Sequence, residues 1–108
     1  MAISTKSAES LDDIVARLVE GLKPDRIYLF GSQASGQAGP DSDFDLLVVV
    51  SESDLPRHQR EKISYDLLWG LRTSVDVIVL TQEEFQRAIR VKTSLASSAR
   101  DHGKRLYG

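Results

Sequence analysis

Residues 26–50 read RIYLFGSQASGQAGPDSDFDLLVVV, and this stretch decides the fold that the sequence predicts. Its two apolar runs, residues 26–30 and 44–50, are typical of strands, and a polar, glycine-rich loop joins them. The second run is unbroken after Asp45, which indicates a strand that is buried on both faces. The stretch therefore predicts two strands and a connecting loop over residues 33–42.

Two aspartates, Asp43 and Asp45, stand where the second strand begins. Side chains of a strand alternate between its faces, so both carboxylates point the same way, about 7 Å apart along the backbone. Two neighbouring carboxylates are costly unless a positive charge lies between them. Mg²⁺ takes oxygen ligands and is usually held by one or two carboxylates together with substrate phosphates. The pair therefore indicates a site for a divalent metal.

Gly31 and Ser32 follow the first strand directly. Glycine lets the backbone approach a phosphate closely, and serine offers a small hydroxyl and a backbone N–H as donors. A turn that holds phosphate beside a strand that holds metal indicates phosphoryl or nucleotidyl transfer with two metal ions.

The Gly31-Ser32 pair, followed after ten residues by Asp43-x-Asp45, resembles the signature of the DNA polymerase β-like nucleotidyltransferase superfamily. The small size of the chain is similar to that of the minimal nucleotidyltransferases, the antitoxin partners of helical HEPN-domain RNase toxins. The resemblance covers roughly residues 10–107. It implies an α+β fold, with a small mixed β-sheet covered by helices.

The resemblance also implies roles for five residues. Asp43 and Asp45 would bridge two Mg²⁺ ions, with Mn²⁺ as an alternative, and Asp76 from a later strand would bind the second ion. Gly31 and Ser32 would hold the phosphates of ATP or another NTP. The expected enzyme is a nucleotidyltransferase that moves a nucleoside monophosphate, AMP for preference, to a hydroxyl acceptor. A tyrosine of a partner HEPN toxin is the expected acceptor, which would make the protein an antitoxin.

One position departs from the family pattern, because Ser35 stands where an arginine is usual. Losing that cation should weaken the binding of a triphosphate unless another residue compensates. Arg57, Arg60 and Lys62 are candidates for this role. The departure favours an alternative function, a nucleotidyltransferase-fold module with little or no turnover that neutralises a toxin by contact.

Other interpretations fit the sequence less well. Asp41, Asp43, Asp45 and Glu52 match positions of a calcium-binding loop, but Leu46 stands where that loop needs glycine. The glycine turn and the aspartates could also be ordinary loop and cap residues. Modification of an aminoglycoside or of a nucleic-acid 3′ end would require a second domain or a broad basic stripe. The net charge of −2 makes nucleic acid an unfavourable partner.

The rest of the chain predicts a single domain over residues 10–108 after a flexible N-terminus over residues 1–9. Ser10 is expected to cap a helix that Pro24 ends. A third strand over residues 75–80 carries Asp76, and Thr81 with Glu84 forms a capping box for the next helix. A further helix is expected near residues 94–101, and Leu106 with Tyr107 should pack back on the core.

Localisation is expected to be cytoplasmic. Cysteine is absent, no apolar run approaches the length of a membrane helix, and the N-terminus lacks the apolar segment of a signal peptide.

The second helix should start at Pro56 and run to about Leu71. Its expected inward residues are Ile63, Leu67, Gly70 and Leu71. Tyr65 and Trp69 lie four residues apart on the opposite side, outside this stripe. Either the C-terminal segment covers this aromatic pair, or the pair is exposed and forms an interface with a second copy or a toxin.

Overall fold

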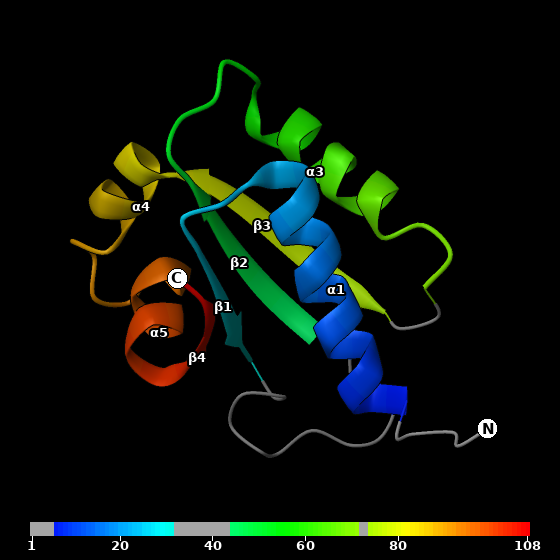
Figure 1. Cartoon of the computed structure of the whole chain (residues 1–108). Helices are drawn as coiled ribbons and strands as arrows, with labels where there is room; N and C mark the ends of the chain where they lie inside the picture. The colour runs from blue at the N-terminus through cyan, green and yellow to red at the C-terminus, as the bar shows by residue number, and fades with distance from the viewer. Residues whose placement is uncertain (1–5, 32–43, 72–73) are drawn as a thin grey trace.

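The computed structural model describes residues 6–31, 44–71 and 74–108, with side chains described from residue 11 onward. Four helices and four strands make up this described part of the chain (Figure 1). The elements are α1 (Lys6–Leu22), β1 (Arg26–Phe30), β2 (Phe44–Val50), α3 (Arg57–Leu67), β3 (Val75–Thr81), α4 (Gln82–Ala88), α5 (Leu95–His102) and β4 (Lys104–Tyr107).

The four strands form one mixed sheet in the order β3-β2-β1-β4. β2 runs parallel to β3 and antiparallel to β1, and β4 pairs antiparallel with the other edge of β1. The predicted bounds of the first two strands and the α+β class are confirmed. β4 was predicted only as a segment that returns to the core, since its four residues begin with Lys104 and Arg105 and lack a strand-like apolar pattern.

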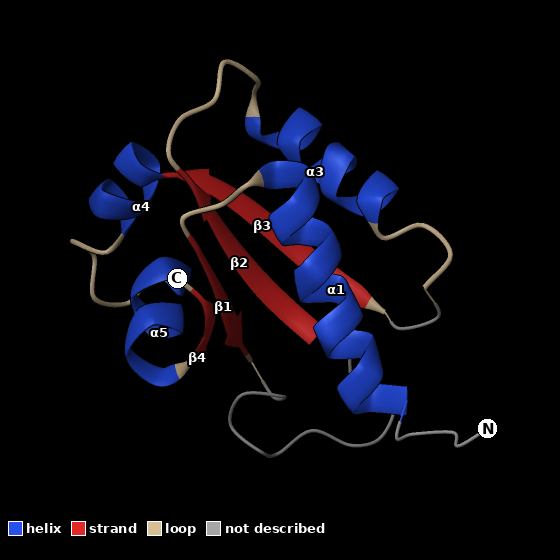
Figure 2. Cartoon of the chain, viewed as in Figure 1, coloured by secondary structure: helices blue, strands red, loops and turns tan. Residues whose placement is uncertain are grey.

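Helices cover both faces of the sheet (Figure 2). Alternate residues of β2, such as Leu46 and Val48, pack with Ile14 and Leu18 of α1. The intervening residues, such as Leu47 and Val49, pack with α4 and α5 on the opposite face. β2 is therefore buried on both sides, as its unbroken apolar sequence predicts.

α1 starts at Lys6, four residues before the predicted Ser10 cap, so Ser10 lies within the helix and does not begin it. Its inward stripe is apolar at the spacing of an α-helix. The stripe consists of Leu11, Ile14, Val15, Leu18, Val19 and Leu22. The helix ends at Leu22, and Lys23, whose φ of 49° is left-handed, and the buried Pro24 follow it.

α3 packs through a face that the sequence predicted only in part. Leu67 and Leu71 pack against the core as predicted, although the helix already ends at Leu67. Ile63 is exposed, and the buried residues of the helix are Arg60 and Ser64. The prediction missed these two because polar residues can be buried when their hydrogen bonds are satisfied. The Ser64 hydroxyl donates to the Arg60 carbonyl at 3.1 Å, and the Arg60 side chain finds its own partners.

The outer edge of β3 is covered by side chains of α3. The Tyr65 hydroxyl accepts from the Val77 N–H at 3.1 Å, and the Glu61 carboxylate accepts from the Val79 N–H at 3.3 Å. Unpaired strand edges are open to pairing with other chains, and buried backbone groups need partners. Two successive turns of α3 thus take the place of a fifth strand.

Arg60 and Glu84 form a bidentate ion pair that joins α3 to the start of α4. Their N–O distances are 2.8 and 3.1 Å, and Arg60 also donates to the carbonyls of Leu55 and Val79. Glu84 at the same time completes the predicted capping box with Thr81. The hydrogen bond from Arg60 lowers the pKa of Glu84 to about 2, from an ordinary value of 4.5.

We predict that Glu84→Gln lowers the free energy of unfolding at pH 7 by about 2–3 kcal/mol, because Arg60, whose side chain is only 7% exposed, loses its ionic partner. Glu84 has a lower pKa in the folded chain than in the unfolded chain. Its contribution is therefore complete above about pH 5 and declines as pH falls from 4.5 toward 2. Urea unfolding of both proteins between pH 7 and pH 2.5 measures this difference.

The control variant is Glu83→Gln, which removes an 86% exposed carboxylate that lies 3.8 Å from Arg87. It should change stability by less than about 0.5 kcal/mol. The Arg60–Glu84 pair would not be important for stability if Glu84→Gln changed the free energy of unfolding as little as Glu83→Gln. The same conclusion would follow if the difference between Glu84→Gln and the parent stayed constant down to pH 2.5.

Candidate functional site

Two of the predicted aspartates lie side by side on adjacent strands. Asp45 on β2 and Asp76 on β3 are partners in the parallel register of the two strands. Neighbouring strands lie about 4.8 Å apart, and residues opposite each other point to the same face. Each aspartate is the second residue of its strand, so both lie at the end of the sheet where β2 and β3 begin. Asp45 is partly buried, and Asp76 is exposed.

Both aspartates lie on the face that carries α4 and α5. Asp45 shares its face of β2 with Leu47, and Asp76 shares its face of β3 with Ile78; both apolar residues belong to the cluster around Phe85. The other face of β3 carries Val77 and Val79, which pack in the cluster with α1.

Gly31 borders Asp45 from the other side. The register of β1 and β2 pairs Phe30 with Asp45, so Gly31 follows directly after that pair. Its φ of 76° is in the left-handed region, and a Cβ at this position would collide with the Asp45 Oδ2 atom. Only glycine therefore leaves room for the Asp45 carboxylate at the end of β1.

The described residues bring together three of the five predicted site residues, Gly31, Asp45 and Asp76. Ser32 and Asp43 lie outside the described residues. Within the described ranges, no cluster of three or more acidic, histidine or cysteine side chains is placed to hold a metal ion. Asp45 and Asp76 supply carboxylate oxygens, the type of ligand that Mg²⁺ takes. Because Gly31 has no side chain, the space beside the Asp45 carboxylate stays open.

Two of the cations proposed to compensate for Ser35 are already engaged. Arg60 is buried against Glu84, and it donates to the carbonyls of Val79 in β3 and of Leu55 before α3. Arg57 pairs with Glu61 on the same helix at 3.0 Å. Arg60 is therefore not a residue that could reach a triphosphate, and this expectation is corrected.

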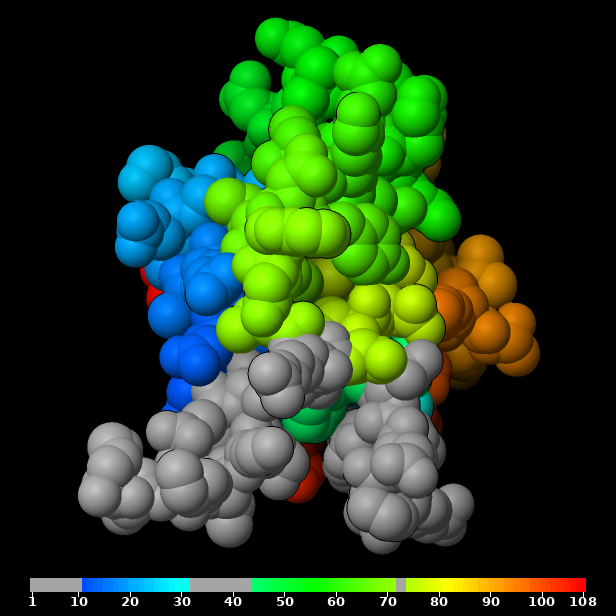
Figure 3. All heavy atoms as spheres, turned by 90° about the vertical axis from the view of Figure 1, so that its right-hand side faces the viewer, coloured from blue at the N-terminus to red at the C-terminus, as the bar shows by residue number. Residues whose placement is uncertain are grey.

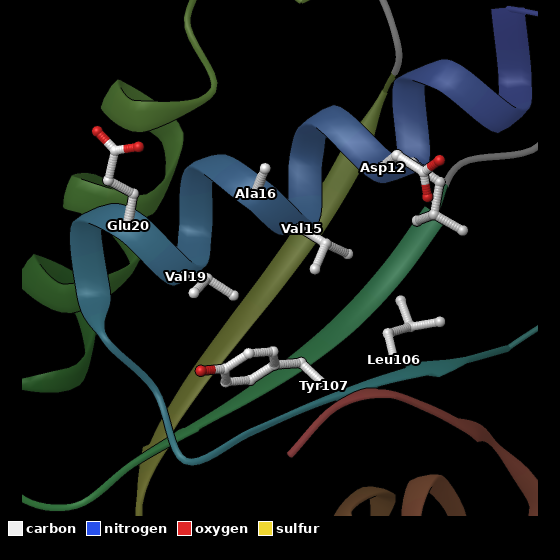
Figure 4. A pocket seen from close by; sticks show the side chains of 8 residues that line it. Asp12, Val15, Ala16, Val19, Glu20, Leu106 and Tyr107 are labelled. Carbon is white, nitrogen blue, oxygen red and sulfur yellow. The ribbon is translucent and has the colours of Figure 1, made fainter.

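A hollow of about 490 Å³ lies between α1 and β4, away from the aspartates (Figure 4). Val15, Val19 and Leu106 give it an apolar wall, and Asp12 and Glu20 stand toward its two ends. Sequence reasoning missed this groove because it did not predict β4. Gly31, Asp45 and Asp76 do not line this groove.

A second hollow, of about 440 Å³, lies beyond the C-terminal end of α3. Figure 3 shows this side of the molecule, with α3 and the residues after it across its centre. We call this site the aromatic hollow; it is lined by Tyr65, Leu68, Trp69, Gly70, Leu71 and Val75. Trp69 is 84% exposed, so of the two alternatives for the aromatic pair the structure shows the exposed one. The C-terminal segment does not cover it, because Leu106 and Tyr107 line the groove against α1.

The profile of the nucleotidyltransferase domain family matches residues 9–106. This match extends over nearly the whole chain. The chain therefore belongs to the nucleotidyltransferase family. In the described part of the chain, no helix has both the length and the apolar character that crossing a membrane requires.

Several solved structures are similar to this chain. A protein from Sulfolobus solfataricus, described as a candidate nucleotidyltransferase, is 26% identical over 81% of this chain and 84% of its own, with a TM-score of 0.58. A chain of a toxin–antitoxin structure solved with AMP-PNP is 25% identical over 90% of this chain and 72% of its own, with a TM-score of 0.63.

A chain of a mutant MntA–HpeT toxin–antitoxin structure is 26% identical over 91% of this chain and 72% of its own, with a TM-score of 0.58. No curated protein matched in the corresponding sequence comparison. The structural neighbours are consistent with the resemblance to minimal nucleotidyltransferases that the sequence motif indicates.

We predict that Gly31→Ala weakens the apparent affinity for ATP with Mg²⁺ at least about tenfold, because its Cβ displaces the Asp45 carboxylate. The affinity is read from the stabilisation of the protein by the ligand. Gly70→Ala is the matched control. Gly70 also has a left-handed φ, of 91°, but nothing lies within 4 Å of a Cβ there. Thermal unfolding at several ATP concentrations measures both variants.

Both variants should lose roughly 1 kcal/mol of stability from the left-handed backbone alone. The crowding of Asp45 should appear only in Gly31→Ala. Equal nucleotide responses in the two variants would show that the close approach of Gly31 to Asp45 does not matter for binding.

Proposed function

We propose that this protein is a Mg²⁺-dependent nucleotidyltransferase that moves AMP from ATP to a hydroxyl group of a partner protein. The single observation that carries the proposal is the register that places Asp45 beside Asp76, with Gly31 against Asp45. A similar chain was solved in a structure with AMP-PNP, which supports ATP as the nucleotide.

In the proposed site, Asp45, Asp76 and Asp43 would hold two Mg²⁺ ions, or Mn²⁺. The bound metal would supply positive charge to the triphosphate and promote ionisation of the acceptor hydroxyl. Gly31 leaves its backbone accessible to the β- and γ-phosphates, and Ser32 offers a hydroxyl and an N–H to them. Asp76, the more exposed of the two described carboxylates, would orient the acceptor.

The transfer breaks one bond and forms one. The acceptor oxygen attacks the α-phosphorus of ATP and loses its proton, and the bond from the α-phosphorus to the bridging oxygen breaks. Pyrophosphate leaves on the Gly31 side with the electron pair of that bond. The product is a phosphodiester between AMP and the acceptor.

The proposed acceptor is a tyrosine of a helical HEPN toxin, so that the transfer inactivates the toxin and the protein acts as an antitoxin. The similarity to chains of toxin–antitoxin structures supports this choice of partner. The exposed aromatic side chains, Tyr65 and Trp69, are of the type that anchors protein interfaces. The same surface would also serve a homo-oligomer.

A second candidate function is neutralisation of the toxin by contact, with little or no turnover. The observation that favours it is that two of the three cations expected to compensate for Ser35 already pair with carboxylates in the described part of the chain. Ser35 stands where the family has arginine, and Arg57 and Arg60 are held by Glu61 and Glu84.

We predict that Asp76→Asn and Asp45→Asn each reduce the transfer of label from ATP labelled at the α-phosphate by at least about a hundredfold. Asp54→Asn, which changes an exposed carboxylate in the connection between β2 and α3, should keep the parental rate and serves as the control. The assay follows acid-precipitable label in a protein extract of cells that carry the gene. The proposal also expects ATP with Mg²⁺ to raise the melting temperature of the parent protein.

The two candidate functions give different results in this assay. Label transfer that depends on Asp45 and Asp76 supports the enzyme. A parent protein that transfers no label and whose melting temperature ATP with Mg²⁺ does not change would favour the contact mechanism.

A further inference from the structure

Phe30 is the neighbour of Asp45 across β1 and β2. The register pairs the two residues directly, and both lie on the face of the sheet that carries α4 and α5, because Phe30 packs against the cluster around Phe85. Side chains that face each other on antiparallel strands have their Cβ atoms about 4.5–5.5 Å apart. The Phe30 ring therefore stands beside the Asp45 side chain, on the side away from Asp76.

Phe30 and Gly31 leave one direction open to the Asp45 carboxylate on the β1 side. Phe30 fills the space over the sheet, whereas Gly31, the next residue, has no side chain at the end of the strand. The Asp45 Oδ2 atom lies in this free space, since a Cβ on Gly31 would collide with it. A large residue followed by glycine thus directs the carboxylate past the end of β1.

The Phe30 ring is itself held from behind. On its other side lies the junction of α5 and β4, because β4 begins beside Leu29. In this junction, Gly103 lies so close to the carbonyls of Leu29 and Ala99 that a Cβ would collide with both. Ala99 is fully buried in the cluster against which Phe30 packs. Close packing on this side leaves the ring little room to move away from Asp45.

Charge repulsion is the reason that Asp45 needs such a support. Asp45 and Asp76 are neighbours across β2 and β3, and two like charges at this distance repel each other. In the absence of a cation, this repulsion drives the Asp45 carboxylate toward β1. Phe30 occupies the space over β1 and excludes water from it. The carboxylate is therefore kept in one orientation before a metal ion arrives, so less conformational entropy is lost on binding.

We infer that Phe30 is a positioning residue for the metal site, which acts by holding the Asp45 carboxylate at the end of β1. This inference rests on the proposed function, in which Asp45 binds a divalent metal. The bulk of the side chain is what matters, because the ring acts by filling space. Shortening Phe30 therefore weakens metal binding although it removes no ligand atom.

The test is a titration with Mn²⁺ in the absence of nucleotide, followed through the relaxation of water protons. Asp45→Asn defines the signal that belongs to the site, because this variant should lose it. Phe30→Ala should weaken Mn²⁺ binding about tenfold or more, the size of effect that the loss of a support for a metal ligand has. Phe30→Leu keeps most of the volume and should restore the affinity to within about threefold of the parent.

Leu80→Ala is the matched control. Leu80 is partly buried in the same cluster, but it lies four residues beyond Asp76 on β3, about 13 Å along the strand. Both alanine variants should melt at a lower temperature than the parent, and the titrations are made well below these temperatures. The affinity for Mn²⁺ should fall only in Phe30→Ala. If Phe30→Ala does not fold, Phe30→Val replaces it and should bind Mn²⁺ more weakly than Phe30→Leu.

The label-transfer assay gives a second readout. In Phe30→Ala, the Mg²⁺ concentration for half-maximal transfer should rise about tenfold, while the rate at saturating Mg²⁺ stays within about threefold of the parent rate. A maximal rate that falls with no change in the Mg²⁺ requirement would show that Phe30 acts on something other than the metal site, and would overturn the inference.

The outcomes separate the role of Phe30 from the proposed function. If Phe30→Ala binds Mn²⁺ as tightly as the parent, or if Leu80→Ala weakens binding equally, Phe30 is not a positioning residue and the proposed function is unaffected. If Phe30→Leu binds no better than Phe30→Ala, filling of space does not position Asp45, and the inference is wrong as well. If Mn²⁺ binding responds as expected but the parent transfers no label, the proposed transfer fails while the role of Phe30 stands. A parent that binds no Mn²⁺ through Asp45 would overturn both.

Discussion

The central constraint of this structure is the burial of β2 on both faces, between an antiparallel and a parallel neighbour. A shift of β2 by one residue would exchange the residues packed against α1 for those packed against α5, and because both sets are apolar it is the close fit of the individual side chains that opposes the shift. The same register places Asp45 opposite Phe30 on one side and Asp76 on the other. The packing of the core therefore also fixes the geometry of the carboxylates.

α3 connects this core to the surface beside the site. Its buried side holds Arg60 against Glu84, and the side along β3 supplies acceptors to the N–H groups of Val77 and Val79. Tyr65 and Trp69 are exposed at and just beyond the C-terminal end of the helix. One helix thus protects the sheet edge and carries an aromatic surface at its C-terminal end.

Local patterns predicted much of this fold, whereas long-range contacts account for the errors. The bounds of β1 and β2 and the Thr81–Glu84 capping box follow from neighbouring residues, and the structure confirms them. Burial of Arg60 depends on a partner 24 residues away, so an apolar count misassigned the face of α3. Of the site, motif spacing predicted Gly31 and Asp45, but Asp76 came from the family resemblance, because a parallel register is set only in the folded chain.

The hydrogen bonds between α3 and β3 depend on two repeats that nearly coincide. Four helical residues advance about 6 Å, and two strand residues advance about 6.6 Å. Glu61 and Tyr65 therefore meet Val79 and Val77 in turn, with the helix and the strand running in opposite directions along each other. One residue inserted between Glu61 and Tyr65 would rotate the tyrosine by about 100° and leave the Val77 N–H without its acceptor. The length of α3 between these two residues is therefore fixed by the spacing of the N–H groups along β3.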